Sequence, residues 1–369
     1  MRTLANWFPR VAGFSICFVY LVTSVWWWRN RFLRLYYPTN EWPTCHQFFP
    51  SCGDYILYPG VPQLILIAFG ILSILGMILW VANWQRFAWW LTLGLLILKF
   101  FLFIGRFGMM GNYHLMHFLF TVVFLCASNG LQIYRWTFVV VYFLAGLLKL
   151  NLEWLSGAAL VNPSWLSGPW LSFGLAYVVV LEIVVSWFLM SRNRLLRIAA
   201  LVQFIIFHIF SWHVVGPFYP LTMLGLLFPL ILAEFFPYED WSLKDLFHFG
   251  GAIAALFLAW NLMNEMTLRD SALEGYFRGL RINMLDARSV CHPIAMLRSK
   301  DSTAILNFPA STKALRTHCD PAIFKSHLRK YCQNLQDGEA LDWVLYARRT
   351  TSSHLLMVES ERNFCASAH

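Results

Sequence analysis

Charged side chains are scarce in this sequence, since Asp, Glu, Lys and Arg together make up only 13% of its 369 residues. Hydrophobic residues make up 59%, a share that a water-soluble domain of this length could not bury. The scarcity of charge therefore excludes an ordinary soluble protein and predicts a polytopic protein that lies in a lipid bilayer. The 18 tryptophans and 33 phenylalanines agree with this class, because aromatic rings gather at bilayer interfaces and between packed helices.

Neither a basic stripe nor a nucleic-acid-binding motif accompanies the formal net charge of +9, which excludes nucleic acid as a partner. Basic residues near the ends of apolar runs instead indicate orientation, since cytoplasmic loops are enriched in Lys and Arg. Arg86, Arg135 and the arginines of 192–197 fall on one side and place the N-terminus in the cytoplasm, whereas those of 29–34 oppose this assignment. No small-residue cleavage site follows the run 11–28, so we interpret it as a retained first span.

Apolar runs long enough to cross a bilayer core of about 30 Å occur about nine times. They lie near residues 11–28, 62–83, 87–105, 114–128, 136–152, 169–190, 198–215, 220–236 and 246–265. The runs 114–128 and 136–152 are short for a crossing, so we expect them to be tilted, re-entrant or partly unwound, as segments that hold sites often are. The sequence thus predicts an all-α polytopic membrane domain in residues 1–265, in a bacterial inner membrane or its equivalent. Nine crossings leave the C-terminal domain outside.

The composition changes after residue 265. Residues 266–369 contain 14 Lys and Arg and 10 Asp and Glu, so 24 of these 104 residues are charged, against 23 of the first 265. This change predicts a small soluble α+β domain. The segments SVCHPIAMLRS and STAILNFPA bracket a polar turn and indicate a hairpin, and DWVLYARR and LLMVES indicate two more strands. A helix is expected between them, with Asp320 as its N-cap and Pro321 at its first position.

The eight cysteines include no CxxC pair, so their spacing predicts no zinc site, and we expect no metal. Cys45 and Cys52 share a Pro-rich loop that the predicted topology places outside, where a disulfide could close it; two free thiols are the alternative. The neighbouring pairs Cys291–His292 and His318–Cys319 would suit a metal, but surface residues at a strand end and a turn explain them equally well.

Several charged residues fall at membrane depth, where each Lys or Arg costs roughly 2.5 to 3.5 kcal/mol on insertion scales. Lys99 and Arg106 lie toward an end of the third run, from which their side chains can snorkel to the interface. Glu182 and Glu234 are expected to form ion pairs with those bases or with Lys149. Four histidines lie in the same runs: His114, His117, His208 and His213. A lone intramembrane histidine is usually a satisfied hydrogen-bond donor.

Lys149 stands near the outer end of its run, in the stretch VYFLAGLLKLNLEWLSG. Glu153 and Trp154 follow at spacings of four and five, so the amine can pair with Glu153 or face a protein cavity. Snorkelling to the outer surface is the third possibility. A dry cavity would disfavour the ammonium form and make this amine a usable base.

This stretch resembles the signature of the vitamin K-dependent gamma-glutamyl carboxylase family, whose membrane part is called the horizontally transferred transmembrane domain. The matching residues are Ala145, Gly146, Lys149, Leu150, Glu153, Trp154 and Gly157. GNYHLMHFLFTVVFLCASN is similar to the family's Asn-His helix, through Asn112, His114 and Asn129. FHIFSWHVVGPF is similar to its Phe-His helix, through Phe207, His208, Gly216 and Phe218. The resemblance covers most of 105–235 and, thinly, 275–340.

The resemblance implies an enzyme with Lys149 and His114 as catalytic residues. Lys149 would deprotonate a reduced vitamin K, a lipophilic quinol of the menaquinol or phylloquinol type. O2 then adds to the quinol anion and yields an alkoxide that removes a γ-proton from a glutamate in a peptide or protein; the carbanion captures CO2, and the quinone leaves as its epoxide. His114 would serve the later carbanion or carboxylation step. The residues expected to line the cavity or bind substrate are His208, Asn112, Glu153, Trp154 and Gly157. Such chemistry requires a chamber from which water is excluded.

Two functions from other classes stay open. Animal carboxylases carry a longer lumenal part that grips a substrate propeptide, and the 104 residues after residue 265 leave little room for one. The chain could therefore be a non-enzymatic scaffold or maturation partner for a secreted peptide, with the same membrane domain. A proton-coupled transporter could use Glu182, Glu234 and the histidines as a relay, but the two halves of the chain show no repeat symmetry.

Overall fold

The structure is a computed structural model of the chain, and it describes most of the residues. These are 7–29, 60–104, 111–127, 130–160, 164–236, 248–267, 271–274, 281–282, 289–299, 302–306, 319–336 and 338–367. Cys45 and Cys52, with the disulfide predicted between them, lie outside the described residues. Arg106, Asn129 and His318 lie outside them as well.

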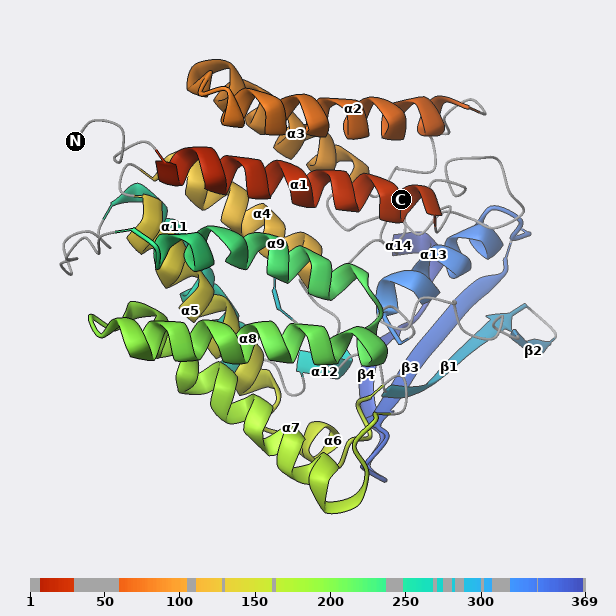
Figure 1. Cartoon of the computed structure of the whole chain (residues 1–369). Coiled ribbons are helices and arrows are strands. Elements are labelled where there is room, and N and C mark those ends of the chain that lie inside the picture. The colour runs from red at the N-terminus through yellow and green to blue at the C-terminus, as the bar shows by residue number, and fades with distance from the viewer. Residues whose placement is uncertain are drawn as a thin grey trace.

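Apolar helices form most of the described chain before the C-terminal sheet (Figure 1). In chain order they are α1 Trp7–Arg29, α2 Val61–Val81, α3 Gln85–Ile104, α4 Asn112–Cys126, α5 Gly130–Leu148, α6 Leu152–Leu155, α7 Gly168–Ile183, η4 Val185–Met190, α8 Arg194–Val215, α9 Phe218–Ala233, α11 Phe249–Thr267 and α12 Ser271–Glu274. Six are long and apolar enough to cross a membrane: α1, α2, α3, α5, α7 continued by η4, and α8. Helices α4 and α9 are apolar but have only 15 and 16 residues, or about 22 to 24 Å at 1.5 Å per residue. A mostly helical fold with six candidate membrane-spanning helices is therefore confirmed, whereas the predicted count of nine spans is not.

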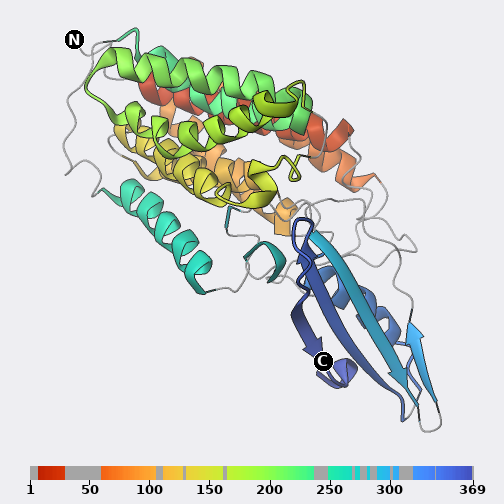
Figure 2. The same cartoon turned by 90° about the horizontal axis from the view of Figure 1, so that it is seen from below.

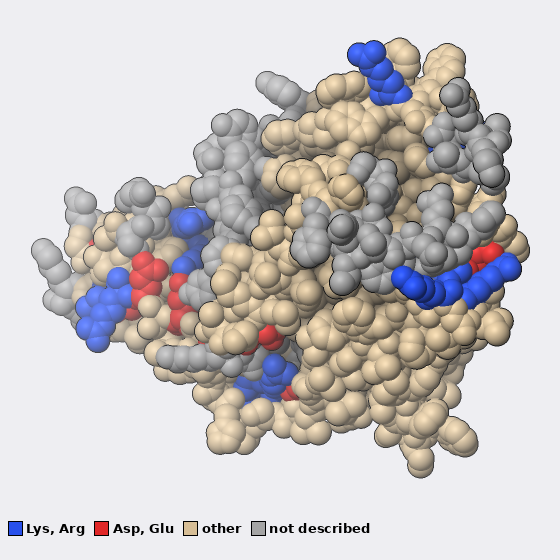
Figure 3. Space-filling model, turned by 90° about the vertical axis from the view of Figure 1, so that its left-hand side faces the viewer, with Lys and Arg blue, Asp and Glu red and all other residues tan. Residues whose placement is uncertain are grey.

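Helix α1 lies between α2 and α9 (Figure 1), and close contacts hold it against α2. A Cβ at Gly13 would come within 2.3 Å of the Trp80 side chain, and one at Gly76 within 2.7 Å of Cys17 Sγ. Glycine at these positions lets the two backbones approach, which is how helices associate in lipid, where no hydrophobic force acts between them. Uncharged residues dominate the face of the molecule in Figure 3, and charged side chains gather in a few places.

Arginines collect at the end of the bundle where α1 begins. Arg10 donates to Val81 O at the end of α2, at 2.5 Å. Arg135 of α5 and Arg197 of α8 both bind the carboxylate of Glu234, at 3.0 and 2.7 Å. The expected ion pair of Glu234 is confirmed, but its partners in the described part of the chain are these two arginines rather than Lys99 or Lys149.

The C-terminal part of the chain forms a four-stranded antiparallel sheet of order β2-β1-β3-β4, which extends away from one end of the bundle (Figure 2). Its elements are β1 Ser289–Arg298, β2 Thr303–Leu306, α13 Pro321–Cys332, β3 Ala340–Arg349, β4 Leu356–Glu361 and α14 Phe364–Ser367. Phe324 and Leu328 of α13 pack with Ala295 and Trp343 of the sheet into a small core. The predicted hairpin, the helix beginning at Pro321 and the two later strands are confirmed. The predicted domain boundary after residue 265 stays a prediction.

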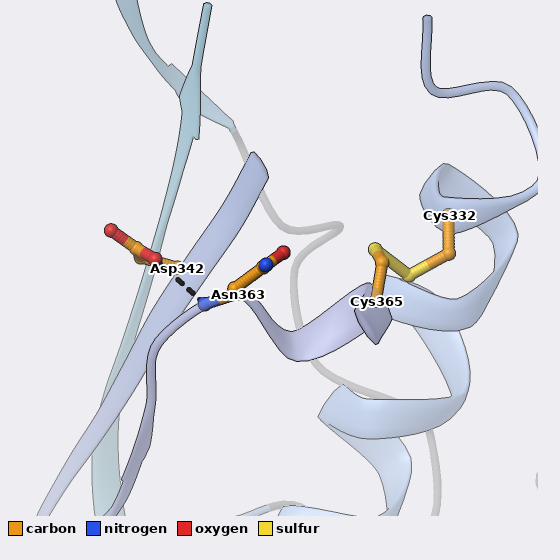
Figure 4. The surroundings of a disulfide bond; sticks show 4 residues. All are labelled: Cys332, Asp342, Asn363 and Cys365. Atoms are coloured by element: carbon orange, nitrogen blue, oxygen red, sulfur yellow. Dashed lines mark hydrogen bonds between the residues drawn. A yellow bond between two sulfur atoms is a disulfide. The ribbon is translucent and has the colours of Figure 1, made fainter. Parts of the chain in front are cut away.

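Two disulfides link this sheet and its helices covalently. Cys291 of β1 bonds to Cys319, just before α13, and Cys332 at the end of α13 bonds to Cys365 of α14 (Figure 4). Cys291 and Cys319 are therefore a disulfide pair and not merely surface residues of a strand end and a turn, which corrects the expectation from the sequence. The two closed loops of 28 and 33 residues stabilise the fold by roughly 3 to 4 kcal/mol each in the chain-entropy account.

Candidate functional site

Lys149 follows the last residue of α5 and lies in the turn that leads into α6. Its backbone N–H donates to Gly146 O at 3.0 Å, and Asn151 caps α6 by accepting from the backbone N–H of Trp154 at 2.9 Å. This turn directs the lysine side chain inward, so that Lys149 has no exposed surface. Its Nζ lies 5.0 Å from the centroid of the Trp154 ring. Burial of this kind excludes snorkelling to the outer surface.

Glu182 of α7 is the ionic partner of Lys149. The Nζ–Oε2 distance is 2.5 Å and both side chains are buried; Nζ also donates to Ala145 O at 3.4 Å. Of the bases considered for Glu182, the structure selects Lys149, whereas the alternative pairing of Lys149 with Glu153 is wrong. The amine and the carboxylate together can hold one proton with no net charge, which reduces the energy of burying them. Within the described residues, Glu182 Oε1 is buried and has no hydrogen-bond partner.

Gly146 lets α5 and α7 approach closely enough for this pair to form. A Cβ on Gly146 would lie 2.6 Å from Ile183 Cγ1 and 3.0 Å from Glu182 Cβ, so any larger residue would push the two helices apart. Gly146 precedes Lys149 by three residues and belongs to the motif singled out in the sequence. The motif therefore contains both the amine and the gap that admits its partner.

A second polar group lies beside the pair, formed by Tyr142, His208 and Tyr219. The Tyr142 hydroxyl is 2.8 Å from His208 Nε2, and the His208 and Tyr219 rings are 5.4 Å apart. Lys149 interacts electrostatically with His208, and Glu182 with Tyr142. In the part of the chain that the structure describes, His208 Nδ1 is buried without a hydrogen-bond partner. Four helices, α5, α7, α8 and α9, thus contribute to one buried polar cluster.

The two tyrosines were missed in the sequence. Tyr142 precedes Lys149 by seven residues, about two helical turns, so the spacing in the sequence could have indicated it. Tyr219 offers no such indication, because it joins the cluster only through the packing of α9 against α8.

His114, in the first turn of α4, has aromatic surroundings. Its ring centroid lies 5.2 Å from Trp27, 5.7 Å from Phe218 and 6.0 Å from Phe103. Phe218 precedes Tyr219, so the first turn of α9 lies against both His114 and His208. Asn112, the first residue of α4, is buried as well.

Glu153 of α6 binds the C-terminal domain. Its Oε2 accepts from Arg349 Nη1 of β3 at 2.9 Å, and its Oε1 accepts from the Thr351 hydroxyl. Burial raises the pKa of Glu153, but the hydrogen bonds from Thr351 and Arg349 and the arginine charge outweigh it, so the pKa lies below its ordinary value. The carboxylate of the motif therefore links the turn around Lys149 to the sheet.

Trp154 and Gly157 shape the turn around Lys149. Trp154 Nε1 donates to Leu175 O of α7 at 3.0 Å, which fixes the indole near the lysine amine. Gly157 has a φ of +79°, a left-handed conformation that favours glycine, and it lies against side chains of α7.

Lys99 of α3 does not snorkel, contrary to the sequence prediction. The residue is 1% exposed, and its Nζ lies 2.7 Å from His117 Nδ1 of α4. Its position in the third run suggested an escape to the interface, but the packing of α4 on α3 encloses it. His213, by contrast, stacks on Trp165 at 3.9 Å and lies at the partly exposed end of α8.

Within the described residues, no group of three or more His, Cys, Asp or Glu could hold a metal ion. The buried cluster instead offers an amine, a carboxylate oxygen without a partner, an imidazole and two phenols. These groups can accept a proton from a hydroxyl and bind the resulting anion. No protein-family model, curated protein or solved structure compared with the chain matches it.

Proposed function

We propose that this protein is a quinol-dependent membrane enzyme of the gamma-glutamyl carboxylase type. The observation that carries the proposal is the buried Lys149–Glu182 pair at 2.5 Å, inside the motif that resembles the carboxylase family. A buried ionic group at membrane depth marks a functional site by default, because its insertion is costly. A lipophilic quinol, a lipid-soluble gas and a strong base all require such a water-poor site.

The residues around the pair have distinct parts in this proposal. Glu182 Oε1 is the free acceptor to which a quinol hydroxyl donates, and the Lys149–Glu182 pair takes up its proton. The pair then carries one positive charge opposite the new anion, which it stabilises in a low-dielectric surrounding. His208, oriented by Tyr142, donates to or accepts from the quinol's second oxygen, and His114 serves the later step at the substrate glutamate.

O2 is the oxidant, and oxidation of the bound quinol to its epoxide would drive the reaction. In balance, a hydroquinone, O2, CO2 and a glutamate C–H give a quinone epoxide, water, a carboxylated glutamate and one proton. The chain's own contribution is to position these reactants, to exclude water and to hold the protons that move.

The topology belongs to the same proposal. Helices α4, α9 and α11 complete nine crossings, the N-terminus is cytoplasmic, and the C-terminal domain is outside. Two observations support this orientation. Arg135 and Arg197 lie at the bundle end opposite Lys149: Arg135 precedes Lys149 by 14 residues, or about 21 Å along α5. The two disulfides of the sheet favour an oxidising compartment.

The test uses the full chain purified in lipid nanodiscs with reduced vitamin K and O2, and it measures quinone epoxide. Wild-type protein is expected to form epoxide, and Lys149→Ala to lose at least about 100-fold of that rate, the contribution of a positioned base. Lys325→Ala is the matched control, because it removes a lysine that pairs with Glu359 in the sheet domain. Undiminished epoxide formation in Lys149→Ala would discard the base assignment. A wild-type protein that turns over no quinol but co-purifies with a specific peptide would favour the scaffold function.

A further inference from the structure

One carboxylate connects the helical bundle to the C-terminal sheet, and both of its oxygens are used. Glu153 of α6 is 3% exposed. Its Oε2 accepts from Arg349 Nη1 at 2.9 Å, and its Oε1 accepts from the Thr351 hydroxyl. Arg349 ends β3, and Thr351 follows it in the turn toward β4. Because the two donors come from one turn, they fix the orientation of the carboxylate as well as its position.

The short helix that carries Glu153 depends on side-chain contacts for its place. Helix α6 has only four residues, and a helix of one turn is not stable in isolation. Asn151 caps its first turn, and Trp154 Nε1 donates to Leu175 O of α7 at 3.0 Å. The hydrogen bonds of Glu153 anchor the same helix to the sheet. The sheet therefore contributes to where α6 lies.

Trp154, the neighbour of Glu153 in α6, connects this anchor to the amine of Lys149. The centroid of its ring lies 5.0 Å from Lys149 Nζ, and aromatic faces attract a cation. The same Nζ lies 2.5 Å from Glu182 Oε2. A displacement of α6 would move the indole relative to the amine, and a misplacement of about 1 Å at a reacting group costs about 100-fold in rate. A continuous set of contacts thus runs from β3 to the proposed base.

We propose that Arg349 and Thr351 are positioning residues for Lys149, which act through Glu153 and Trp154. The C-terminal domain thereby completes the membrane site: it holds α6 so that the indole stays against the amine, and it supplies no group to the proton transfer itself. This inference rests on the proposed function, and it adds the requirement that the sheet be docked on α6 for the base to work at its full rate.

The test measures epoxide formation per folded protein in nanodiscs with reduced vitamin K and O2. Arg349→Met is expected to lower kcat about 10- to 100-fold, with the KM for the quinol unchanged within about twofold. Arg349→Lys keeps a charged donor for Glu153 Oε2 and should recover most of the rate. Arg298→Met removes a half-exposed arginine that pairs with Asp342 in the sheet, so this control should keep the wild-type rate. A wild-type kcat in Arg349→Met would overturn the proposal.

A double variant tests whether Arg349 acts through Glu153. Effects of two residues in one contact are not additive. Arg349→Met combined with Glu153→Gln should therefore lose no more activity than the larger of the two single losses. Losses that multiply in the double variant would show that Arg349 acts by another route and would overturn the proposed one.

A readout without turnover applies if wild-type protein forms no epoxide, a result that would overturn the proposed function. Lys149 and Lys99 are both buried, and mass spectrometry measures how far a membrane-permeant succinimidyl ester acylates each of them. Arg349→Met should raise the acylation of Lys149 about 10-fold relative to that of Lys99, because only the segment around Lys149 opens locally. Arg298→Met should leave this ratio unchanged. General destabilisation would expose both lysines together, so an unchanged ratio in Arg349→Met would overturn the positioning role.

Discussion

Two lysines are buried in the same helical bundle, and they differ in their partners. Lys149 lies 2.5 Å from the carboxylate of Glu182, whereas Lys99 lies 2.7 Å from the imidazole of His117. An ammonium on Lys149 is balanced by the carboxylate of Glu182, so the first pair is neutral before it takes up a further proton. An ammonium on Lys99 has a neutral imidazole as its partner, so the second pair is positively charged whenever its amine is protonated. The difference teaches that burial alone does not define the role of an intramembrane lysine, since the partner sets the net charge of the site.

The largest effect is expected from a change that makes the Lys149 site resemble the Lys99 site. Glu182→Gln keeps the shape of the side chain but removes the charge that balances the amine. Removing one partner of a buried ion pair costs about 3 to 5 kcal/mol of unfolding free energy, and epoxide formation should fall with it. Denaturant unfolding in detergent measures the stability.

Glu359→Gln, which alters the lysine-paired glutamate of the sheet domain, is the matched control and should lose about 1 kcal/mol or less. Equal losses in the two variants would contradict the distinction between the fully buried pair and the partly exposed pair.

A smaller loss of stability and of epoxide formation is expected when Gly146, the contact residue between α5 and α7, is replaced. Gly146→Ala places a Cβ 2.6 Å from Ile183, and overpacking of this kind costs about 1 to 3 kcal/mol. The displaced helix should also reduce epoxide formation, because small shifts of a reacting group are costly. Gly94→Ala on α3, where a Cβ would meet nothing within 4 Å, is the control for both measurements. A Gly146→Ala protein with wild-type stability and rate would show that close approach of α5 and α7 is unnecessary.

The Lys149 site also has a link to the sheet, through Glu153 and Arg349. Arg349→Met should cost about 1 to 2 kcal/mol, since it leaves a buried carboxylate with one donor fewer. Arg348→Met is the control: this neighbouring arginine bonds Ser352 O instead. The thermal unfolding midpoints of the two variants are compared, and the link is wrong if Arg348→Met is the less stable protein.

The smallest expected effect is a loss of stability at low pH that comes from Glu153. The pKa of Glu153 is lower in the folded protein than in the unfolded chain, so its ionisation stabilises the fold above the ordinary glutamate value of about 4.3. That contribution is lost as the pH falls through the lower, folded-state pKa. Wild-type protein should therefore lose its stability advantage over Glu153→Gln between about pH 5 and about pH 3. A constant difference in unfolding midpoint across this range would show that the carboxylate is not the stabilising form.

The sequence predicted the helical, membrane-spanning class because composition and apolar run length decide it locally. It also singled out Lys149, Glu182, His114 and His208, since polar residues are conspicuous in apolar runs. Which of them pair was decided by tertiary packing: the gap at Gly146 selects Glu182 as the partner of Lys149, and no sequence spacing encodes that contact.

Two features of the fold could not be predicted from the sequence. The position of a residue along an apolar run does not indicate which side of the helix faces a neighbouring helix. Lys99 was therefore expected at the bilayer interface, although α4 encloses it. Four cysteines permit three connectivities, so Cys291 and Cys319 could not be paired from sequence alone.

The most direct test is an experimental structure of the protein in lipid with reduced vitamin K bound under anaerobic conditions. The account predicts a quinol hydroxyl within about 3 Å of Glu182 Oε1 or Lys149 Nζ, with the ring near Tyr142 and His208. A headgroup bound elsewhere in the bundle, with the Lys149–Glu182 pair still closed to it, would contradict the account.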